Sequence, residues 1–342
     1  MKPVVLCGLI LWGLSGCFGS PVFKGPTSDH FDGEVFFNPG GVKINDGIDD
    51  LLRWRRNRDQ GPWPAWVEAE PGPAPPERVG SGEMKVTFVN HATVLLQMDG
   101  LNILTDPIWS DRTSPLSWAG PERVRAPGIR FEDLPPIDAV IISHDHYDHL
   151  DTPTLIRLHE AHRPRLFAGL GTGAIFEAVG IEGAEELDWW QEAELGGGVS
   201  LTSVPAQHFS GRGALDRNRT LWMGFVISGS SGVAYFAGDT GFGPHFEEIA
   251  ARFGPVRLAM LPIGAFRPRS FMAPVHIDPE QAVQAHQVLG ARTSVGIHFG
   301  TFPLADDGMD EPAQELAEAL DRAGVDEGSF WVMGFGEGRS VP

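Results

Sequence analysis

The stretch Ser143-His144-Asp145-His146-Tyr147-Asp148-His149-Leu150-Asp151 decides the fold, because it gathers several metal-binding side chains in one short loop. It follows the apolar run 137–142, which is short, continuous and rich in β-branched residues and therefore predicts a buried strand. Beyond the loop, Asp151 or Thr152 can cap a helix that carries Pro153 in its first turn. A rigid strand end that presents several side chains to one point suits a metal site.

The spacing within this loop indicates two groups of ligands. His144 and His146 point roughly the same way, because alternate side chains of an extended backbone share a face. Asp148 and His149 follow and can reach a second ion nearby. Imidazole and carboxylate ligands without a thiolate favour zinc or another first-row metal.

Three apolar runs later in the chain predict strands that each deliver one more metal-binding side chain. These pairs of run and residue are 199–204 with His208, 233–237 with Asp239, and 293–297 with His298. Strand ends in a mixed sheet are the usual place for a site. We therefore expect these three side chains to converge on the loop at 144–149.

The first residues predict an export signal. A positive start at Lys2 precedes an apolar run from Val4 to Leu14, which is too short to span a bilayer. Leu14-Ser15-Gly16-Cys17 resembles the bacterial lipobox, which implies cleavage before Cys17 and lipid attachment to its thiol. The chain is then an exported bacterial lipoprotein, anchored on the periplasmic side at the outer membrane. The alternative is an ordinary signal peptide in which Cys17 is incidental.

After the signal at 1–17, composition divides the chain again. Residues 18–83 are rich in Gly and Pro and predict a linker and N-terminal arm, with Phe31, Val35, Phe36 and Phe37 as possible anchors. A catalytic domain is expected over 84–342. It opens with strand runs at 85–89, 92–98 and 101–105, the last two joined by the hairpin signal Asp99-Gly100.

The net charge argues against nucleic-acid partners, and the positions of the cysteines argue against disulfide bonds. The 342-residue chain has a net charge of −19, which argues against nucleic-acid binding because that is driven by basic surface. The cysteines, Cys7 and Cys17, both fall in the signal, so we expect no disulfide in the folded part. Stability must then come from a large core and bound metal.

Several polar residues admit two interpretations. Asp106 can support a ligating histidine or simply form a turn. His276 can cap the helix expected from Pro279, or it can face a substrate. The roles of His30 and His91 stay open on the sequence alone.

The candidate ligand set resembles the signature of the metallo-β-lactamase superfamily, whose fold is an αββα sandwich of two mixed sheets flanked by helices. Residues 90–151 and 187–302 are similar, more closely, to the N-acylphosphatidylethanolamine-hydrolysing phospholipase D family. The matching pieces include Asn90-His91-Ala92-Thr93-Val94-Leu95, Leu104-Thr105-Asp106-Pro107-Ile108, Phe236-Ala237-Gly238-Asp239-Thr240-Gly241 and His298-Phe299-Gly300-Thr301-Phe302. The lipobox departs from the animal enzymes and fits a bacterial member.

This resemblance implies two zinc ions and a role for each site residue. One ion takes His144, His146 and His208, the other takes Asp148, His149 and His298, and Asp239 bridges both. Asp148, Asp239 and His276 are the catalytic candidates, and Tyr147 and His276 match positions that contact the phospholipid.

The implied reaction converts N-acylphosphatidylethanolamine-like phospholipids to N-acylethanolamine and phosphatidic acid, with a hydroxide activated by the metal pair attacking phosphorus. The implied partners are the phospholipid and the membrane surface reached through the lipid anchor. One alternative is a hydrolase of the same fold for another phosphodiester, ester, lactone, thioester or β-lactam. The other is a non-catalytic lipoprotein with structural zinc.

Overall fold

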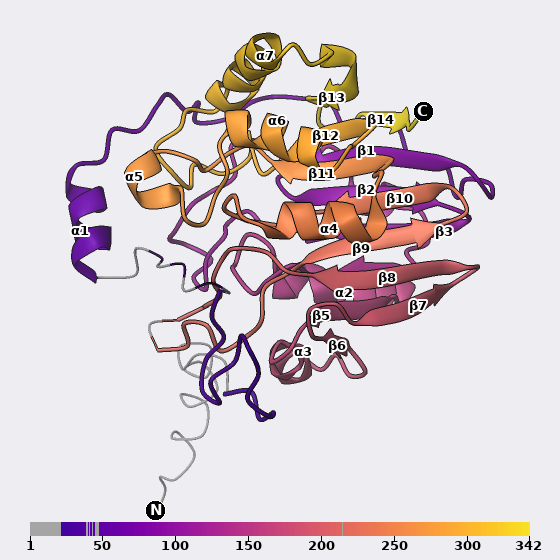
Figure 1. Ribbon diagram of the computed structural model, residues 1–342, viewed down its shortest axis with the longest axis horizontal. Coiled ribbons are helices and arrows are strands. Elements are labelled where there is room, and N and C mark those ends of the chain that lie inside the picture. Colours follow the sequence, from indigo (N-terminus) through magenta and orange to yellow (C-terminus); the bar gives the residue numbers. More distant parts are fainter. Residues whose placement is uncertain (1–21, 39, 41, 43, 45–47, 214) are drawn as a thin grey trace, which may run out of the picture.

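The computed structural model describes residues 22–38, 40, 42, 44, 48–213 and 215–342 (Figure 1). The signal at 1–17, with Cys17, therefore lies outside the described residues. Within them, the strands form two mixed sheets of seven strands each. No helix in this part of the chain has the length and apolar character needed to cross a bilayer.

The first sheet has, in spatial order, β14 (Gly338–Ser340), β1 (Met84–Asn90), β2 (Thr93–Met98), β3 (Leu101–Thr105), β4 (Ala139–Ile141), β5 (Arg165–Gly169) and β6 (Glu185–Leu187). The second has β13 (Phe330–Trp331), β12 (Thr293–Ile297), β11 (Leu258–Pro262), β10 (Gly232–Phe236), β9 (Gly224–Gly229), β8 (Val199–Val204) and β7 (Glu192–Gly196). Strands β3 to β6 run parallel to one another, and so do β10 to β13.

Helices cover the outer faces of both sheets (Figure 1). The α-helices are α1 (Ile48–Arg56), α2 (Thr152–His162), α3 (Gly173–Ala178), α4 (His245–Phe253), α5 (Arg269–Met272), α6 (Pro279–Val288) and α7 (Glu311–Ala323), and the 3-10 helices are Phe131–Asp133 and Glu327–Ser329. Helices α2 and α3 share a core cluster with the first sheet, whereas α4, α6 and α7 pack with the second. This arrangement confirms the predicted αββα sandwich.

The alternation of side chains along a strand explains the layers. On β2, Val94 and Leu96 lie in the core between the sheets, and Leu95 lies in the cluster that contains Leu155 and Leu158 of α2. Each such burial contributes roughly 1.5–3 kcal/mol before chain entropy is subtracted. Because both faces of the strand are covered, every residue of β2 is buried.

The N-terminal arm also packs on the sandwich. Phe31 and Phe36 are 2% and 0% exposed and belong to the larger hydrophobic core cluster of the sandwich. Phe37, expected as a further anchor, is 39% exposed, because it alternates with buried Phe36.

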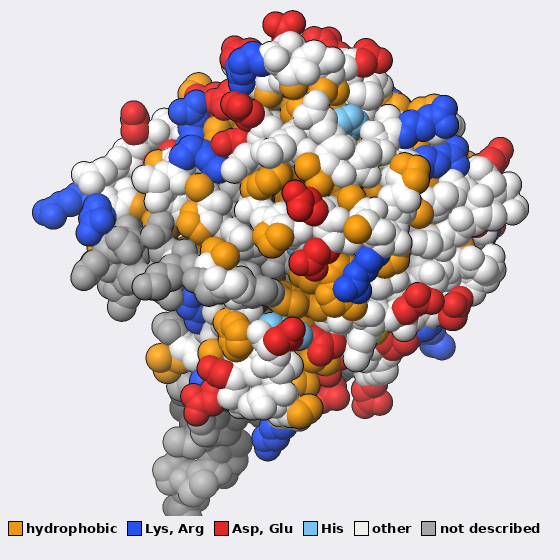
Figure 2. All heavy atoms as spheres, viewed as in Figure 1, with side chains coloured by type: hydrophobic (Ala, Val, Ile, Leu, Met, Phe, Trp, Pro, Cys, Tyr) orange, Lys and Arg blue, Asp and Glu red, His pale blue; other side chains and the backbone are white. Residues whose placement is uncertain are grey.

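On the face shown in Figure 2, acidic side chains gather over α7, which includes Glu315 and Glu318.

Candidate metal centre

Three histidine side chains converge beside the loop that follows β4. The Nδ1 atom of His146 lies 2.8 Å from Nε2 of His144 and 3.3 Å from Nε2 of His208, which follows β8. His144 and His208 are each 1% exposed. Burial, reinforced by the neighbouring histidines, holds the pKa of His144 and of His208 well below the ordinary value. Both rings are therefore neutral, which is the form that binds a metal.

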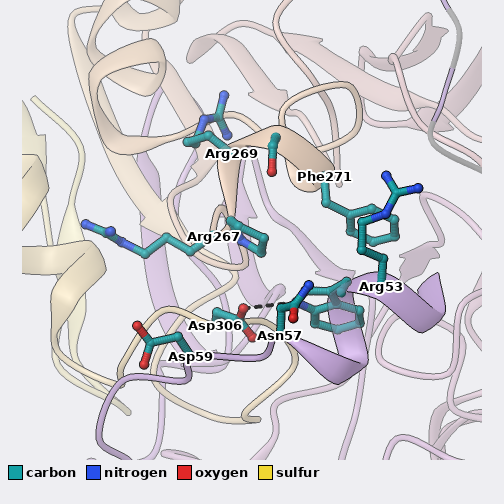
Figure 3. Close-up of a pocket in the computed structure, with 10 residues that line it drawn as sticks. Arg53, Asn57, Asp59, Arg267, Arg269, Phe271 and Asp306 are labelled. Atoms are coloured by element: carbon teal, nitrogen blue, oxygen red, sulfur yellow. Dashed lines mark hydrogen bonds between the residues drawn. The ribbon is translucent and has the colours of Figure 1, made fainter. Parts of the chain in front are cut away.

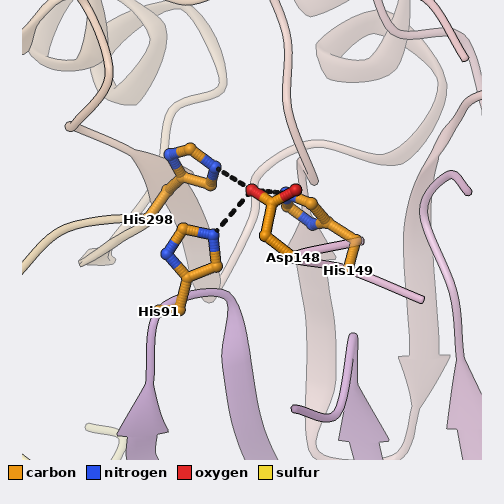
Figure 4. A group of neighbouring side chains, drawn as sticks. All are labelled: His91, Asp148, His149 and His298. Carbon is orange, nitrogen blue, oxygen red and sulfur yellow. Dashed lines mark hydrogen bonds and ion pairs between the residues drawn. The ribbon is translucent and has the colours of Figure 1, made fainter. Parts of the chain in front are cut away.

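A second group surrounds the carboxylate of Asp148. Its Oδ2 atom lies 3.3 Å from Nε2 of His149, 3.3 Å from Nε2 of His298 and 3.0 Å from Nε2 of His91. Figure 4 shows the rings of His91 and His298 directed at this carboxylate from one side, with His149 beside it. His149 comes from the loop after β4, His298 from the end of β12, and His91 from the turn between β1 and β2.

Asp239, just past the end of β10, connects the two groups. Its Oδ2 atom lies 3.3 Å from Nε2 of His149, 3.1 Å from Nε2 of His298 and 3.8 Å from Nε2 of His208. Its Oδ1 atom is buried and has no hydrogen-bond partner among the described residues. A carboxylate with one oxygen within 3.8 Å of members of both groups is in the place that a bridging ligand requires.

The charges at this point fit a divalent cation. Burial opposes ionisation of Asp239, but His149 and His298 outweigh it and hold the pKa of Asp239 well below its usual value. Burial opposes the charge of His298 as well, yet Asp239 and Asp148 raise the pKa of His298 to about 9. Protons on these histidines thus balance the buried carboxylates, and metal binding would displace them.

The donor atoms themselves support the same interpretation. Buried polar atoms without a partner are rare in folded proteins, and each asks for an explanation. Here Nε2 of His149, Nδ1 of His276 and Oδ1 of Asp239 are buried and have no hydrogen-bond partner among the described residues. Nitrogen and carboxylate donors without thiolate suit zinc and related first-row ions. The residues present therefore fit the metal pair that the resemblance implies.

Neighbouring polar groups fix the orientation of the candidate ligands. The Nδ1 atom of His208 lies 2.9 Å from the carbonyl oxygen of Val275, so its Nδ1–H is donated there and Nε2 is left for a metal. The Nδ1 atom of His144 lies 2.9 Å from Oγ of Ser143. Such outer contacts set the tautomer and the direction of a ligating ring.

The structure separates the two expected substrate-contact residues. His276 lies in the centre, with Nδ1 3.8 Å from Oδ2 of Asp239. Asp278, rather than His276, caps α6, which removes the capping interpretation. Tyr147 lies beside the centre: its ring packs under the Arg212 guanidinium at 3.9 Å and lines an adjacent cavity of about 310 Å³ with Ser110.

His91, whose role stayed open on the sequence alone, is part of the candidate site. It is 1% exposed and adopts a positive φ of 47° in the turn between β1 and β2. Its backbone carbonyl accepts a hydrogen bond from the amide of His298, which ties this turn to a candidate ligand. A histidine in a tight turn between two core strands was the available signal, but its proximity to Asp148 depends on β1, β2, β3 and β4 lying side by side in the first sheet.

A second cavity, of about 570 Å³, lies away from the candidate ligands, between α1 and the segment around α5 (Figure 3). Trp54 stacks on Phe271 with ring centroids 5.4 Å apart, and its Nε1–H donates to Asp306 at 3.0 Å. Arg267, on the cavity wall, forms an ion pair with Glu315. The contacts of Trp54 hold α1 against the catalytic domain, and the charge of Arg267 is paired with Glu315.

Comparison with known proteins agrees with this geometry. The profile of the beta-lactamase superfamily domain matches residues 101–299. An N-acyl-phosphatidylethanolamine-hydrolyzing phospholipase D 1 of Caenorhabditis elegans is 40% identical over 263 residues, which cover 73% of this chain and 74% of the relative. A UPF0173 metal-dependent hydrolase of Methanopyrus kandleri is 29% identical over 240 residues, covering 69% and 92%. The solved structure of a metallo hydrolase from Ignicoccus hospitalis superposes with a TM-score of 0.58 at 24% identity, covering 75% and 98%.

The fold and the site together define a metal-dependent hydrolase of the metallo-β-lactamase fold. The chain belongs to the beta-lactamase superfamily, in the same family as the relative named N-acyl-phosphatidylethanolamine-hydrolyzing phospholipase D 1.

Proposed function

We propose that this chain is a zinc phosphodiesterase of phospholipase D type. Its substrates would be N-acylphosphatidylethanolamine-like phospholipids, and its products an N-acylethanolamine and phosphatidic acid. The observation that carries the hydrolytic part is the convergence of two ligand groups on Asp239. The substrate class is supported by the 40% identity to a relative named for that reaction.

The ligand assignment follows the two groups. One zinc ion would take His144, His146 and His208, and a second would take Asp148, His149 and His298, with Asp239 between them. A bound zinc pair would supply a water of lowered pKa and positive charge to balance the phosphoryl oxygens. Seven ligands shared by two ions would leave positions for solvent and substrate, which favours catalysis over a closed structural site.

The chain's own residues would divide the remaining tasks. Asp148 and Asp239 are ionised, so either can hold a cation and accept a proton from the attacking water at a carboxylate oxygen. Burial lowers the pKa of His276 to about 4, although Asp239 opposes that effect, so the ring is neutral at pH 7. Its unpartnered Nδ1 is available to orient a phosphoryl oxygen. Tyr147, in the adjacent cavity, would contact the rest of the lipid.

The location we propose is the periplasmic side of the outer membrane. A lipid on Cys17 would hold the enzyme at the surface that contains its substrate, with 18–83 as linker and arm and 84–342 as catalytic domain. Radiolabelled fatty acid incorporation in the native host tests this, and its loss in Cys17→Ser is expected. Labelling of Cys17→Ser at the level of the unaltered chain would overturn the anchor.

The activity is tested on zinc-loaded protein with N-acylated phosphatidylethanolamine in mixed micelles, with both products measured by mass spectrometry. We expect stoichiometric N-acylethanolamine and phosphatidic acid from the unaltered chain and almost none from Asp239→Asn. Asp306→Asn is a matched control, because Asp306 is equally buried and hydrogen-bonded but lies at the arm. Turnover of a cephalosporin or a lactone, without either lipid product, would instead assign another substrate.

A further inference from the structure

Asn38 in the N-terminal arm contacts a candidate ligand of the metal centre. Phe31 and Phe36 anchor the arm in the core, and the backbone amide of Phe36 donates to the carbonyl of Asn218 at 2.8 Å. Two residues further on, Asn38 is 5% exposed and lies against the backbone of His208. The family profile begins at residue 101, so nothing in that match assigns a role to this segment.

Asn38 holds both backbone polar groups of His208. Its Nδ2 donates to the His208 carbonyl at 2.8 Å, and its Oδ1 accepts from the His208 amide at 3.1 Å. The same Oδ1 accepts from Nε1 of Trp222 at 3.1 Å. One side-chain amide therefore replaces the strand partner that the backbone loses where β8 ends at Val204.

His208 needs such support more than the other members of its group. His144 and His146 share one short loop directly after β4, whereas His208 lies four residues beyond the end of β8 in irregular backbone. The carbonyl of Val275 fixes the orientation of its ring at Nδ1, but that contact does not fix the position of the His208 backbone. Buried backbone groups without a partner are costly. The two hydrogen bonds from Asn38 therefore favour the one backbone position of His208 in which both of its polar groups are bonded.

We propose that Asn38 is a positioning residue for His208 and that the N-terminal arm is thereby part of the metal centre. The inference rests on the metal-binding part of the proposed function and not on the phospholipid. Contacts outside the ligand shell typically change metal affinity 10- to 100-fold when removed. Asn38→Ala should weaken the ion held by His144, His146 and His208 by about that factor and leave the second ion less affected.

Co²⁺ titration of the full chain, followed by absorption spectroscopy, tests this, because two sites with different ligand sets are expected to differ in absorption and in dissociation constant. His208→Ala identifies the band of the group that contains His208. Asn102→Ala is the matched control: Asn102 is 0% exposed and makes three similar side-chain hydrogen bonds to Glu77, Pro136 and Gln97, far from the ligands. We expect Asn38→Ala to weaken the band that His208→Ala removes, and Asn102→Ala to leave both bands unchanged.

If an alanine variant does not fold, the pair Asn38→Asp and Asn102→Asp takes its place, since Asp keeps the volume and the acceptor but loses the donor. Unaltered Co²⁺ affinity at both bands in the folded Asn38 variant would overturn the inference while leaving the proposed function intact. Equal weakening by the Asn102 variant would overturn it too, because the effect would then be general destabilisation. An unaltered chain that takes up no Co²⁺ would overturn the proposed function and this inference together.

Discussion

The Oδ2 atom of Asp106 lies 2.7 Å from Nδ1 of His149, and both side chains are fully excluded from solvent. The same carboxylate accepts hydrogen bonds from the amide and the hydroxyl of Ser143. Asp106 thus fixes His149 with Nε2 turned toward Asp148 and Asp239, and it fixes the residue before His144 as well. One carboxylate at the end of β3 supports both candidate ligand groups.

Asp106→Asn should weaken metal binding about 10- to 100-fold. The carboxylate uses one oxygen for the Ser143 amide and the other for the Ser143 hydroxyl and His149, whereas an amide is neutral and has only one oxygen that accepts. Isothermal titration with Zn²⁺ measures the affinity. Asp306→Asn, at a carboxylate that is also buried but is bonded to Trp54 and Arg58, should retain the affinity of the unaltered chain. Equal affinities in all three proteins would contradict the supporting role of Asp106.

His91→Phe should lower turnover by about 10- to 100-fold, because Asp148 loses the Nε2–H donor that holds its Oδ2. Burial and the nearby His298 lower the pKa of His91 to about 3, so the ring acts as a neutral donor. Steady-state hydrolysis of a bis-aryl phosphate measures the effect. His286→Phe is the control, since His286 is 6% exposed and its ring bonds Ser294 in the second sheet. A fully active His91→Phe would remove His91 from the site.

Removal of metal should destabilise the fold, because partly buried Asp148 and buried Asp239 then rely on histidine protons for charge balance. A ligand that binds only the folded state at 100 times its Kd contributes about 2.7 kcal/mol per ion. Thermal unfolding should shift down on addition of a chelator and return with excess Zn²⁺. A melting temperature that is identical with and without chelator would contradict a metal-dependent core.

The arm should be more firmly held in mildly acid than in basic solution. Burial opposes charge on His30, but hydrogen bonds to Asp188 and Asp29 outweigh it and raise its pKa in the folded state. A raised folded pKa contributes stability that is complete below the unfolded value of about 6.5 and is lost as pH rises through the folded value. The pKa of Asp188 is lowered, although burial opposes this, so the contribution of that carboxylate is lost only in acid, below about pH 4.

His30→Gln should therefore cost roughly 1.5–3 kcal/mol in free energy of unfolding near pH 6 and distinctly less near pH 9. Urea unfolding at the two pH values measures it. Asp188→Asn should remove most of this difference. An equal loss at both pH values would show that His30 acts by packing on Trp189 alone.

Much of the fold could be predicted from local patterns. The apolar runs at 85–89, 92–98 and 101–105 form β1, β2 and β3, and Asp99-Gly100 forms their hairpin turn with φ of 49° and 83°. The helix expected after Asp151 begins at Thr152. These elements are confirmed because alternation, turn chemistry and capping are properties of neighbouring residues.

The supporting contacts of the site could not be predicted in the same way. Asp106 pairs with a residue 43 positions away, and Asn38 with one 170 positions away. The first pairing depends on β3 and β4 being neighbours in one sheet, and the second on how the arm packs, and no local pattern specifies either. For that reason His91, His30 and Asp106 had open roles in the sequence, whereas the cluster at 144–149 was recognisable from its composition alone.

The measurement that tests the central claim most directly is the zinc content per chain after equilibrium dialysis, in the unaltered protein and in Asp239→Asn. Two ions per unaltered chain and fewer than two in the variant are expected, since Asp239 lies between both ligand groups. An unaltered chain without zinc, or a variant that holds two ions as tightly, would contradict the account.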